Sequence, residues 1–319
     1  ADVILAVGTR LQDFTTGSWS VFGNEKMRLI SLNAARYDAH KHRALSVVGD
    51  ALVGIEELGK SLADWSGSES WTSKAGTLYA EWNRTIEEHS GKTDTVPPSY
   101  AHVVGAVNRV CDDTDLALTA SGGFPGELCK NWKTKTVGTF DCEFGFSCMG
   151  YEIAGGWGAK MADPSRDVIV FVGDGAYLML NSDVYSSVLT GHKMIIILCD
   201  NGGFGVINRL QNFKGSASFN NLLEDSKVEH LEYVDFVQHA KSMGALGEQV
   251  ESISELEAAF KRAKVADRTY LISIKVQQHQ WTPGDAWWDV GVPEVSQRKE
   301  VRQARADHSE GQKKQRIGV

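Results

Sequence analysis

The chain has 319 residues, 42% of them hydrophobic and 23% charged, which is typical of a soluble globular protein with one or two domains. Its net charge of −8 argues against nucleic acid as a main partner, and no apolar stretch reaches the roughly 18 residues that a membrane span needs. The five cysteines are odd in number and form no CxxC pair, so we expect reduced thiols in a cytoplasmic protein and no zinc site.

The first 62 residues alternate between strand-like and helix-like patterns. They include the predicted strands Val3–Val7, Arg28–Leu32 and Ser46–Val48, and a helix from Ala51 to Leu62. A parallel sheet is normally covered on both faces, and these elements are too few to do so. We therefore expect residues 1–62 to be the last part of a larger Rossmann-like sheet. The chain also begins inside a strand-like run, without an initiator methionine or a signal peptide. We therefore expect a fragment whose missing strands lie upstream.

Residues 63–98 change in character. The segment is rich in turn residues near Ser66, is compatible with a helix over Lys74–Glu88, and becomes extended at Val96-Pro97-Pro98. We interpret residues 63–98 as an interdomain linker with one or two helices.

Residues 99–292 alternate strands with helices. The predicted strands are Leu116–Ala120, Asp167–Val172, Met194–Cys199 and Tyr270–Val276. The predicted helices are Ser99–Arg109 with Ser99 as its cap, Gly150–Met161, Tyr177–Leu189, Val234–Met243 and Ser252–Ala263. This order predicts an α/β domain with a doubly wound, mostly parallel sheet. The charged tail, 293–319, has no apolar period beyond Arg298, so we expect it to be mobile.

Two polar motifs follow neighbouring predicted strands. Gly173-Asp174-Gly175 ends the first strand, and Asn201 comes 27 residues later (201 − 174), at the end of the next strand and before Gly202-Gly203. Parallel strands bring such residues to the same edge of the sheet, where open α/β sheets bind ligands. A carboxylate and an amide oxygen suit a hard divalent cation whose shell substrate phosphates complete. Adjacent glycines let the backbone approach a diphosphate closely.

This pair of motifs resembles the cofactor motif of the acetolactate-synthase-like thiamine-diphosphate enzyme superfamily. The resemblance implies a thiamine-diphosphate-binding fold in 99–292, after the C-terminal part of a central domain in 1–62. It also implies that Mg²⁺ on the diphosphate of thiamine diphosphate is held by Asp174, Asn201 and the backbone carbonyl of Gly203. Ordinary turns without a ligand remain the alternative for these motifs taken alone.

Further segments extend the resemblance over nearly the whole chain. They are Gly122–Leu128, Phe140–Tyr151, Asn201–Leu210 and Ala286–Pro293. They imply that Met149 wedges between the two rings of thiamine. The residues implied to bind the cofactor are Gly122, Gly123, Phe124, Met149, Gly173, Asp174, Gly175, Ala176, Asn201, Gly203, Phe204 and Gly205. Ala176 and Asp200 depart from the family pattern, which often has a hydroxyl residue and an Asn at these positions.

Members of the superfamily activate thiamine with a glutamate on a separate domain, contributed across a dimer interface. Nothing in this chain resembles that domain, so we expect the catalytic base to be missing and the isolated chain to be inactive. Glu127 and Glu143 do not match the motif of the activating glutamate. A homodimer or homotetramer with the active site at the subunit interface is the implied assembly.

The first and last of these segments indicate the branch of the superfamily that hydrolytically cleaves a C–C bond of a polyhydroxylated cyclic dione in myo-inositol catabolism. His279, Trp287 and Trp288 are the candidate substrate residues, because aromatic faces and polar groups near the last strand suit a sugar-like ring. For the two tryptophans, packing in a core or interface is an equal alternative. Two other functions remain open: a 2-keto acid carboligase or decarboxylase, and a cofactor-binding fragment without turnover.

Overall fold

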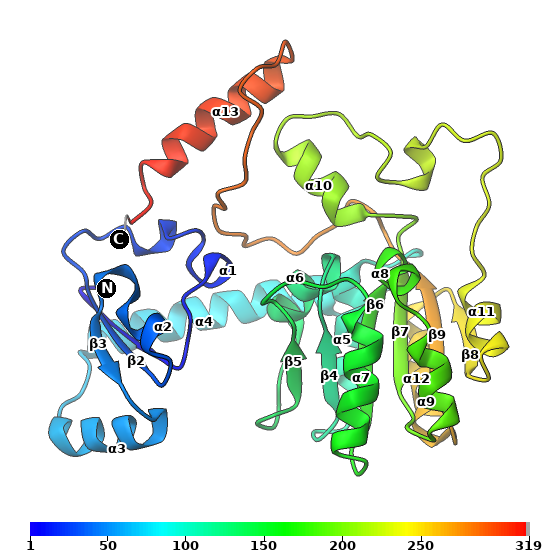
Figure 1. Cartoon of the computed structure of the whole chain (residues 1–319), viewed down its shortest axis with the longest axis horizontal. Coiled ribbons are helices and arrows are strands. Elements are labelled where there is room, and N and C mark those ends of the chain that lie inside the picture. Colours follow the sequence, from blue (N-terminus) through cyan, green and yellow to red (C-terminus); the bar gives the residue numbers. More distant parts are fainter. Residues whose placement is uncertain (317–319) are drawn as a thin grey trace. The chain divides into compact units, whose positions relative to one another are not determined.

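A computed structural model describes residues 1–316, which form two compact units (Figure 1). Unit 1 comprises Ala1–Thr77, Phe213–Ser216 and Gly284–Val319, of which 317–319 lie outside the described residues. Unit 2 comprises Leu78–Asn212 and Ala217–Pro283. The division falls within helix α4 (Glu69–Ser90). This helix takes up much of the predicted linker 63–98. Within residues 1–316, no helix has the length and apolar character needed to cross a membrane.

Unit 2 is built on a six-stranded parallel sheet with the order β5-β4-β6-β7-β9-β8. Its strands are β4 (Leu116–Thr119), β5 (Phe140–Cys142), β6 (Val168–Gly173), β7 (Ile195–Asp200), β8 (Leu246–Val250) and β9 (Tyr270–Lys275). The chain runs outward from β4 to β5 and then returns to place β6 on the other side of β4. Such a reversal opens a crevice at the carboxyl ends of the strands, where α/β sheets bind ligands.

Two apolar layers cover this sheet, one on each face. Ile169, Phe171 and Ile197 pack into one layer, whereas their neighbours along the strands, such as Val170 and Ile196, pack into the other. Alternate residues of a strand point to opposite faces, so runs of apolar residues are buried on both sides. The helices that contribute to the first layer are α5 (Tyr100–Val110), α6 (Gly123–Asn131) and α12 (Ile253–Val265). Those that contribute to the second are α7 (Tyr151–Ala162), α8 (Asp174–Met179), α9 (Asp183–Leu189) and α11 (Phe236–Ser242). The predicted α/β fold is confirmed.

Several predicted boundaries hold, and others differ for local reasons. Ser99 caps α5 in a capping box with His102, as its sequence position indicated. The single helix predicted over Tyr177–Leu189 is wrong. The structure has two helices there, α8 and α9, because Leu180 is extended (φ −154°) and ends the first.

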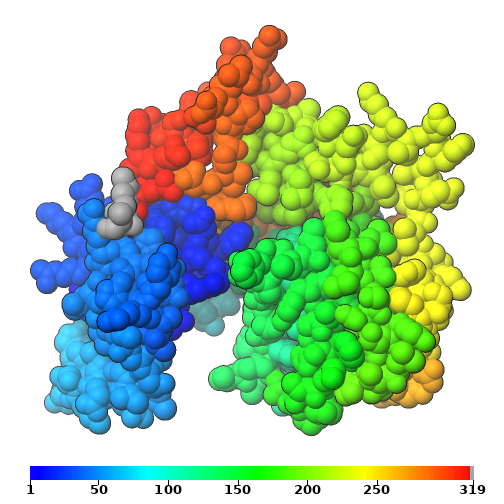
Figure 2. Space-filling view, in the orientation of Figure 1, coloured from blue at the N-terminus to red at the C-terminus, as the bar shows by residue number. Residues whose placement is uncertain are grey.

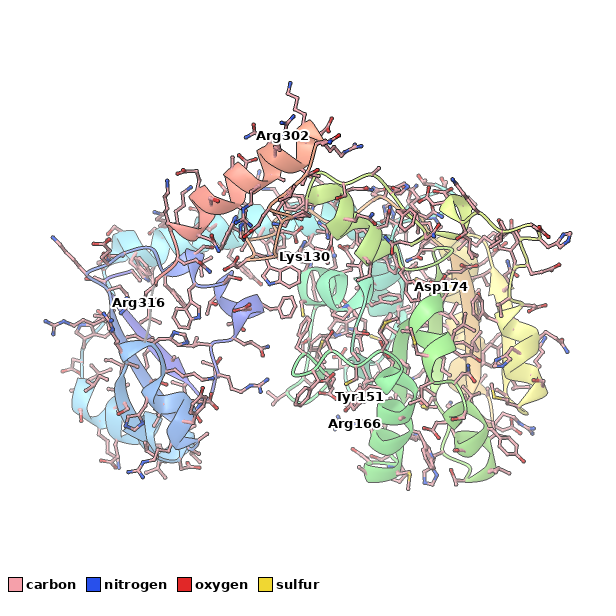
Figure 3. The ribbon with its side chains drawn as sticks, turned by 45° about the horizontal axis from the view of Figure 1, so that its top comes forward. Lys130, Tyr151, Arg166, Asp174, Arg302 and Arg316 are labelled. Carbon is pink, nitrogen blue, oxygen red and sulfur yellow. The ribbon has the colours of Figure 1, made fainter. Side chains whose placement is uncertain are left out.

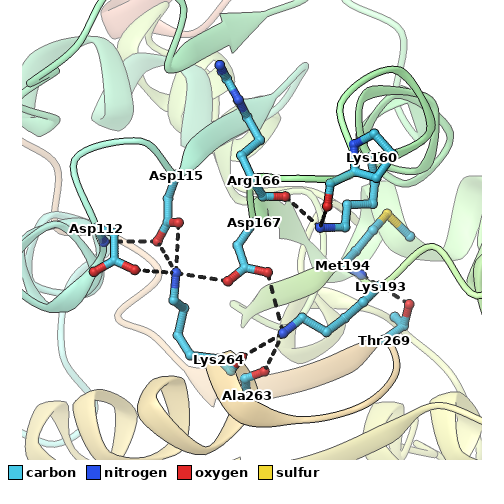
Figure 4. Close-up of polar contacts among 11 residues, drawn as sticks. Asp112, Asp115, Lys160, Arg166, Asp167, Lys193, Met194, Ala263, Lys264 and Thr269 are labelled. Atoms are coloured by element: carbon cyan, nitrogen blue, oxygen red, sulfur yellow. Dashed lines mark hydrogen bonds and ion pairs between the residues drawn. The ribbon is translucent and has the colours of Figure 1, made fainter.

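The amino-terminal edge of the sheet in unit 2 carries a cluster of charges (Figure 4). Lys264 Nζ lies 2.8 Å from carboxylate oxygens of three residues, Asp112, Asp115 and Asp167. The pKa of Lys264 is raised: burial opposes its charge, but the hydrogen bonds that its ammonium group donates to these carboxylates outweigh burial. Asp112 and Asp115 precede β4, and Asp167 precedes β6, so Lys264 joins the starts of two neighbouring strands.

Unit 1 contains a three-stranded parallel sheet in the order β1-β2-β3. The strands are β1 (Val3–Val7), β2 (Arg28–Asn33) and β3 (Leu45–Val48), and helix α3 (Ala51–Leu62) follows with Asp50 as its N-cap. Val3, Leu5 and Val47 remain exposed on the outer strands. Figure 2 draws the first part of unit 1 in blue. Parallel sheets are normally covered on both faces, so this sheet leaves apolar surface uncovered within its own unit.

The tail of unit 1 differs from the prediction of a mobile segment. Residues Lys299–Gln312 form helix α13. Its buried residues are Val301, His308 and Gly311, so only one aliphatic side chain marks the inner face and no apolar period appears in the sequence. Its partner is Trp287, whose ring lies so close to Gly311 that a Cβ there would come within 2.2 Å of it.

Candidate functional site

Asp174 ends the turn after β6 and begins α8 (Figure 3). Its side chain is 5% exposed, and its Oδ2 accepts a hydrogen bond from Gly203 N at 2.7 Å. Its Oδ1 is buried and has no hydrogen-bond partner among the described residues. Burial raises the pKa of Asp174 to about 7, and the negative charge of Asp200 adds to the rise, although backbone N–H groups oppose it. Burial and the like charge of Asp200 thus both disfavour the ionised carboxylate.

Asn201 follows β7 and supplies the second polar side chain of the site. It is 6% exposed, and its Nδ2 donates to Tyr100 Oη at 2.6 Å. Its Oδ1 has no hydrogen-bond partner within residues 1–316 and is buried. Gly205 leaves room for this amide, because a Cβ at position 205 would lie 2.8 Å from Nδ2.

The loop between Asn201 and Gly205 is held in a conformation that only glycine adopts readily. Gly203 has a φ of +142°, and a Cβ there would lie 2.5 Å from the carbonyl oxygen of Asn221. Phe204 N donates to that same carbonyl at 2.7 Å. Gly175 is required for a different reason, because a Cβ there would come within 2.8 Å of the half-exposed ring of Phe204. The two predicted motifs therefore contact each other directly.

These residues fit a divalent cation. Asp174 Oδ1 and Asn201 Oδ1 are hard oxygen atoms without hydrogen-bond partners among residues 1–316. Hard cations such as Mg²⁺ prefer carboxylate and carbonyl oxygens together with phosphate. A cation beside Asp174 would also favour the ionised carboxylate. Among the described residues, no group of three or more His, Cys, Asp or Glu side chains gathers as a metal site.

The predicted diphosphate loop lies at the reversal of strand order, after β4. Gly122 has a φ of +84°, and Gly123 begins α6 against Trp281, whose ring would lie 2.7 Å from a Cβ at position 123. Phe124 is buried and packs its ring against Tyr100 and Phe171. The loop thus presents backbone at the crevice, while its one large side chain belongs to the core.

Glu152 joins this loop to the segment that carries Met149, and sequence reasoning missed it. Its Oε1 accepts from Ser121 N at 3.1 Å and its Oε2 from Gly150 N at 2.8 Å. The side chain is 0% exposed, and burial raises its pKa although the backbone N–H groups lower it. The sequence signal that could have identified Glu152 is its place as an acidic residue inside the Gly- and Ala-rich helix predicted over 150–161. Met149 itself is half-buried against the second apolar layer.

Tyr100 is a further residue that sequence reasoning did not assign to the site, and it contacts Trp281 in the segment after β9. Their rings stack at 5.4 Å with an interplanar angle of 14°. The neighbouring Thr282 is anchored by Glu127, whose Oε2 accepts from Thr282 Oγ1 at 2.6 Å and whose Oε1 accepts from Thr282 N at 3.1 Å. Glu127 therefore holds the segment after β9 against α6.

The remaining predicted residues are distributed over both units. Gly173 is the last residue of β6, and Ala176 is buried in α8. His279 of unit 2 is exposed, with its Nε2 3.9 Å from Glu224 Oε1. Trp287 stacks on His308 at 6.0 Å and Trp288 lies 5.1 Å from Phe14, all within unit 1. The substrate roles of His279, Trp287 and Trp288 stay predictions.

Comparison with known proteins relates this geometry to a family. Residues 121–274 match the family model described as "Thiamine pyrophosphate enzyme, C-terminal TPP binding domain". The chain is 35% identical, over 98% of its length, to a 3D-(3,5/4)-trihydroxycyclohexane-1,2-dione hydrolase of Geobacillus thermodenitrificans, of which it covers 53%. It is 33% identical, over 95% of its length, to the protein of the same name from Clostridium tetani, of which it covers 52%. The chain thus spans about half the length of these curated relatives.

A solved structure shows the same fold. The thiamine diphosphate-dependent 4-hydroxybenzoylformate decarboxylase of Rhodococcus jostii RHA1 superposes with a TM-score of 0.67 at 18% identity, over 86% of this chain and 49% of that one. The expected cofactor class is supported by the family match, because the matched residues contain both Asp174 and Asn201. Residues 121–274 are thus similar to the C-terminal domain that binds thiamine pyrophosphate in enzymes of that family.

Proposed function

We propose that the full-length protein uses thiamine diphosphate to open the ring of 3D-(3,5/4)-trihydroxycyclohexane-1,2-dione hydrolytically, giving 5-deoxy-glucuronate in myo-inositol catabolism. The observation that carries this proposal is 32–35% identity, over 95–98% of the chain, to relatives that bear the name of that hydrolase. Bound thiamine diphosphate supplies an electron sink for breaking a C–C bond beside a carbonyl group.

Within this chain, the role we propose for the site is to hold the cofactor. Asp174, Asn201 and the carbonyl of Gly203 bind Mg²⁺ on the diphosphate, and the backbone of Gly122, Gly123 and Gly175 approaches its oxygens. The two partnerless oxygens support the metal assignment, and the positive φ of Gly122 supports close approach of the backbone. The other cofactor contacts that we propose are Phe124, Met149, Gly173, Ala176, Phe204 and Gly205.

We further propose that the protein acts as a cytoplasmic homo-oligomer. All five cysteines are free in the structure, which is in keeping with a reducing compartment. Leu178 and Met179, adjacent residues of unit 2, are both at least half exposed, and a second subunit could cover this apolar surface.

The test compares two substrates with the full-length protein. We expect ring opening of the cyclic dione only when thiamine diphosphate and Mg²⁺ are present. Pyruvate should be turned over with a kcat/KM at least about 100-fold lower, because a site that hydrogen-bonds ring hydroxyls discriminates strongly against a substrate that lacks them. Faster decarboxylation or carboligation of pyruvate would replace this proposal with the 2-keto acid alternative.

A further inference from the structure

The hydrogen bond between Tyr100 and Asn201 joins residues 101 positions apart in the chain. Tyr100 is the first residue of α5 and is 2% exposed, whereas Asn201 lies in the loop after β7. The bond is 2.6 Å long, and Asn201 Nδ2 is the donor. It links the start of α5 to the loop that carries the predicted metal ligands.

An asparagine binds a cation with one end only. The carboxamide oxygen is a metal ligand, whereas the NH₂ group carries two N–H donors and is repelled by a cation. Rotating the side chain by a half-turn would exchange these two ends at almost no cost in shape. Something must therefore hold the amide with its oxygen toward the metal. In this structure the NH₂ group is engaged by Tyr100 Oη, and Oδ1 is the atom left without a partner among the described residues.

Tyr100 is itself held firmly. Trp281 stacks on one side of its ring, and Phe124 meets it edge to face at 4.9 Å. The capping box of Ser99 and His102 fixes the start of α5, from which Tyr100 projects. A buried side chain contacted in this way has little freedom to follow a rotating amide.

We propose that Tyr100 is a positioning residue for the metal site, which binds the N–H of Asn201 and so presents Oδ1 to the cation. This inference rests on the proposed function, because it assumes that Asn201 binds the metal of thiamine diphosphate. Tyr100 acts through Asn201 and touches neither the metal nor the cofactor.

The test replaces Tyr100 with Phe, which keeps the ring and removes only the hydroxyl group. We measure the affinity of the full-length protein for Mn²⁺ in the presence of thiamine diphosphate by titration calorimetry. Outer residues that orient metal ligands typically change metal affinity 10- to 100-fold, so we expect roughly tenfold weaker binding. The matched control is Tyr270→Phe. Tyr270 is the first residue of β9, at the opposite end of the strands, and the substitution removes its 2.6 Å hydrogen bond to Glu248 of β8. Its Mn²⁺ affinity should equal that of the wild-type protein.

A second background separates orientation from packing. In Asn201→Asp both ends of the side chain are oxygens, so no end needs to be selected. Adding Tyr100→Phe to this background should then leave the Mn²⁺ affinity unchanged or increase it, because the phenol would otherwise donate to a ligand oxygen. An equal loss in both backgrounds would show that Tyr100 acts only by packing and would overturn the inference.

The outcomes also separate this inference from the proposed function. If the wild-type protein binds Mn²⁺ with thiamine diphosphate and Tyr100→Phe binds it equally well, the role of Tyr100 is wrong and the cofactor site stands. If the wild-type protein fails to bind Mn²⁺ with thiamine diphosphate, the proposed cofactor function is contradicted, and the role of Tyr100 is overturned with it.

Discussion

Asp174 Oδ2 accepts a hydrogen bond of 2.7 Å from the backbone N–H of Gly203. This bond ties the turn after β6 to the loop after β7, the two places where the sequence motifs lie. It occupies one carboxylate oxygen and leaves Oδ1 for a ligand. The same residue, Gly203, is the one whose carbonyl we propose as a metal ligand, so its backbone conformation affects both groups.

Gly203→Ala is expected to weaken binding of thiamine diphosphate and Mg²⁺ by at least tenfold. A Cβ at a φ of +142° is strained, and it would meet the carbonyl oxygen of Asn221 at 2.5 Å, so the loop must shift. The control is Gly158→Ala in α7, where a Cβ meets nothing within 4 Å. That variant should bind normally and gain about 0.5–1 kcal/mol of stability, because alanine favours a helix interior. Calorimetry measures the affinity for the cofactor, and urea unfolding measures the stability. Equal affinity of the two variants for thiamine diphosphate and Mg²⁺ would contradict the prediction.

Glu152 is expected to make stability depend on pH. Burial raises its pKa in the folded protein, so between its unfolded pKa, about 4.3, and its folded pKa the folded protein binds more protons than the unfolded chain. Stability contributed by the protonated group is therefore present below the unfolded pKa and is lost as pH rises through this window. Relative to Glu152→Gln, which does not titrate, the wild-type protein should lose free energy of unfolding as the pH rises above about 4.3 and through the folded pKa. Urea unfolding at several pH values measures this, and a free energy of unfolding of the wild-type protein that rises with pH relative to that of Glu152→Gln would contradict the prediction.

Lys264→Met is expected to destabilise unit 2 without affecting the cofactor. The substitution leaves three aspartates at the amino-terminal edge of the sheet without the ammonium group that they share. Removing one member of a largely buried ion cluster leaves uncompensated charge, so we expect a loss of about 2–4 kcal/mol. The affinity for thiamine diphosphate at a temperature where the variant is folded should stay within twofold of wild type. A matching loss of affinity would mean that the cluster also shapes the opposite edge.

Trp288→Ala is expected to raise KM for the cyclic dione while leaving thiamine diphosphate affinity unchanged, if Trp288 has the substrate role predicted from the sequence. Trp288 contacts Phe14, and Trp287 fits against Gly311, so both also pack within unit 1. Trp287→Phe is therefore the milder companion, because Trp287→Ala would leave a cavity and cost about 3–5 kcal/mol. Thermal melting identifies any loss of packing. Unchanged KM and kcat in folded variants would assign both tryptophans to packing alone.

The central strands and the closeness of Asp174 to the loop after Asn201 could be predicted from the sequence because their signals are local. The apolar runs of β6 and β7 end in residues that parallel strands must bring to one edge, so Asp174 and Asn201 were found together. The short strands β5 and β8 were missed. The former has only three residues and the latter, Leu246–Val250, alternates with polar residues at the edge of the sheet.

The supporting residues of the site could not be predicted, because their roles depend on contacts between distant parts of the chain. In the sequence, Tyr100 is an ordinary helix residue. Its role depends on the contact that the folded chain makes between α5 and the loop after β7. Glu152 reads as a polar position of a helix, although its carboxylate holds backbone N–H groups of two separate loops. Helix α13 carries almost no apolar pattern, because its contact with Trp287 depends on a glycine.

The most direct test of the cofactor site is calorimetry with the full-length protein and its Asp174→Ala variant, titrated with thiamine diphosphate in the presence of Mg²⁺. Asp163→Ala, which removes an exposed carboxylate of unit 2, is the control. The account predicts Mg²⁺-dependent binding to the wild-type and control proteins. It predicts no measurable binding to Asp174→Ala, because the diphosphate would then face no properly held cation. Unchanged, Mg²⁺-dependent affinity in Asp174→Ala would contradict the account.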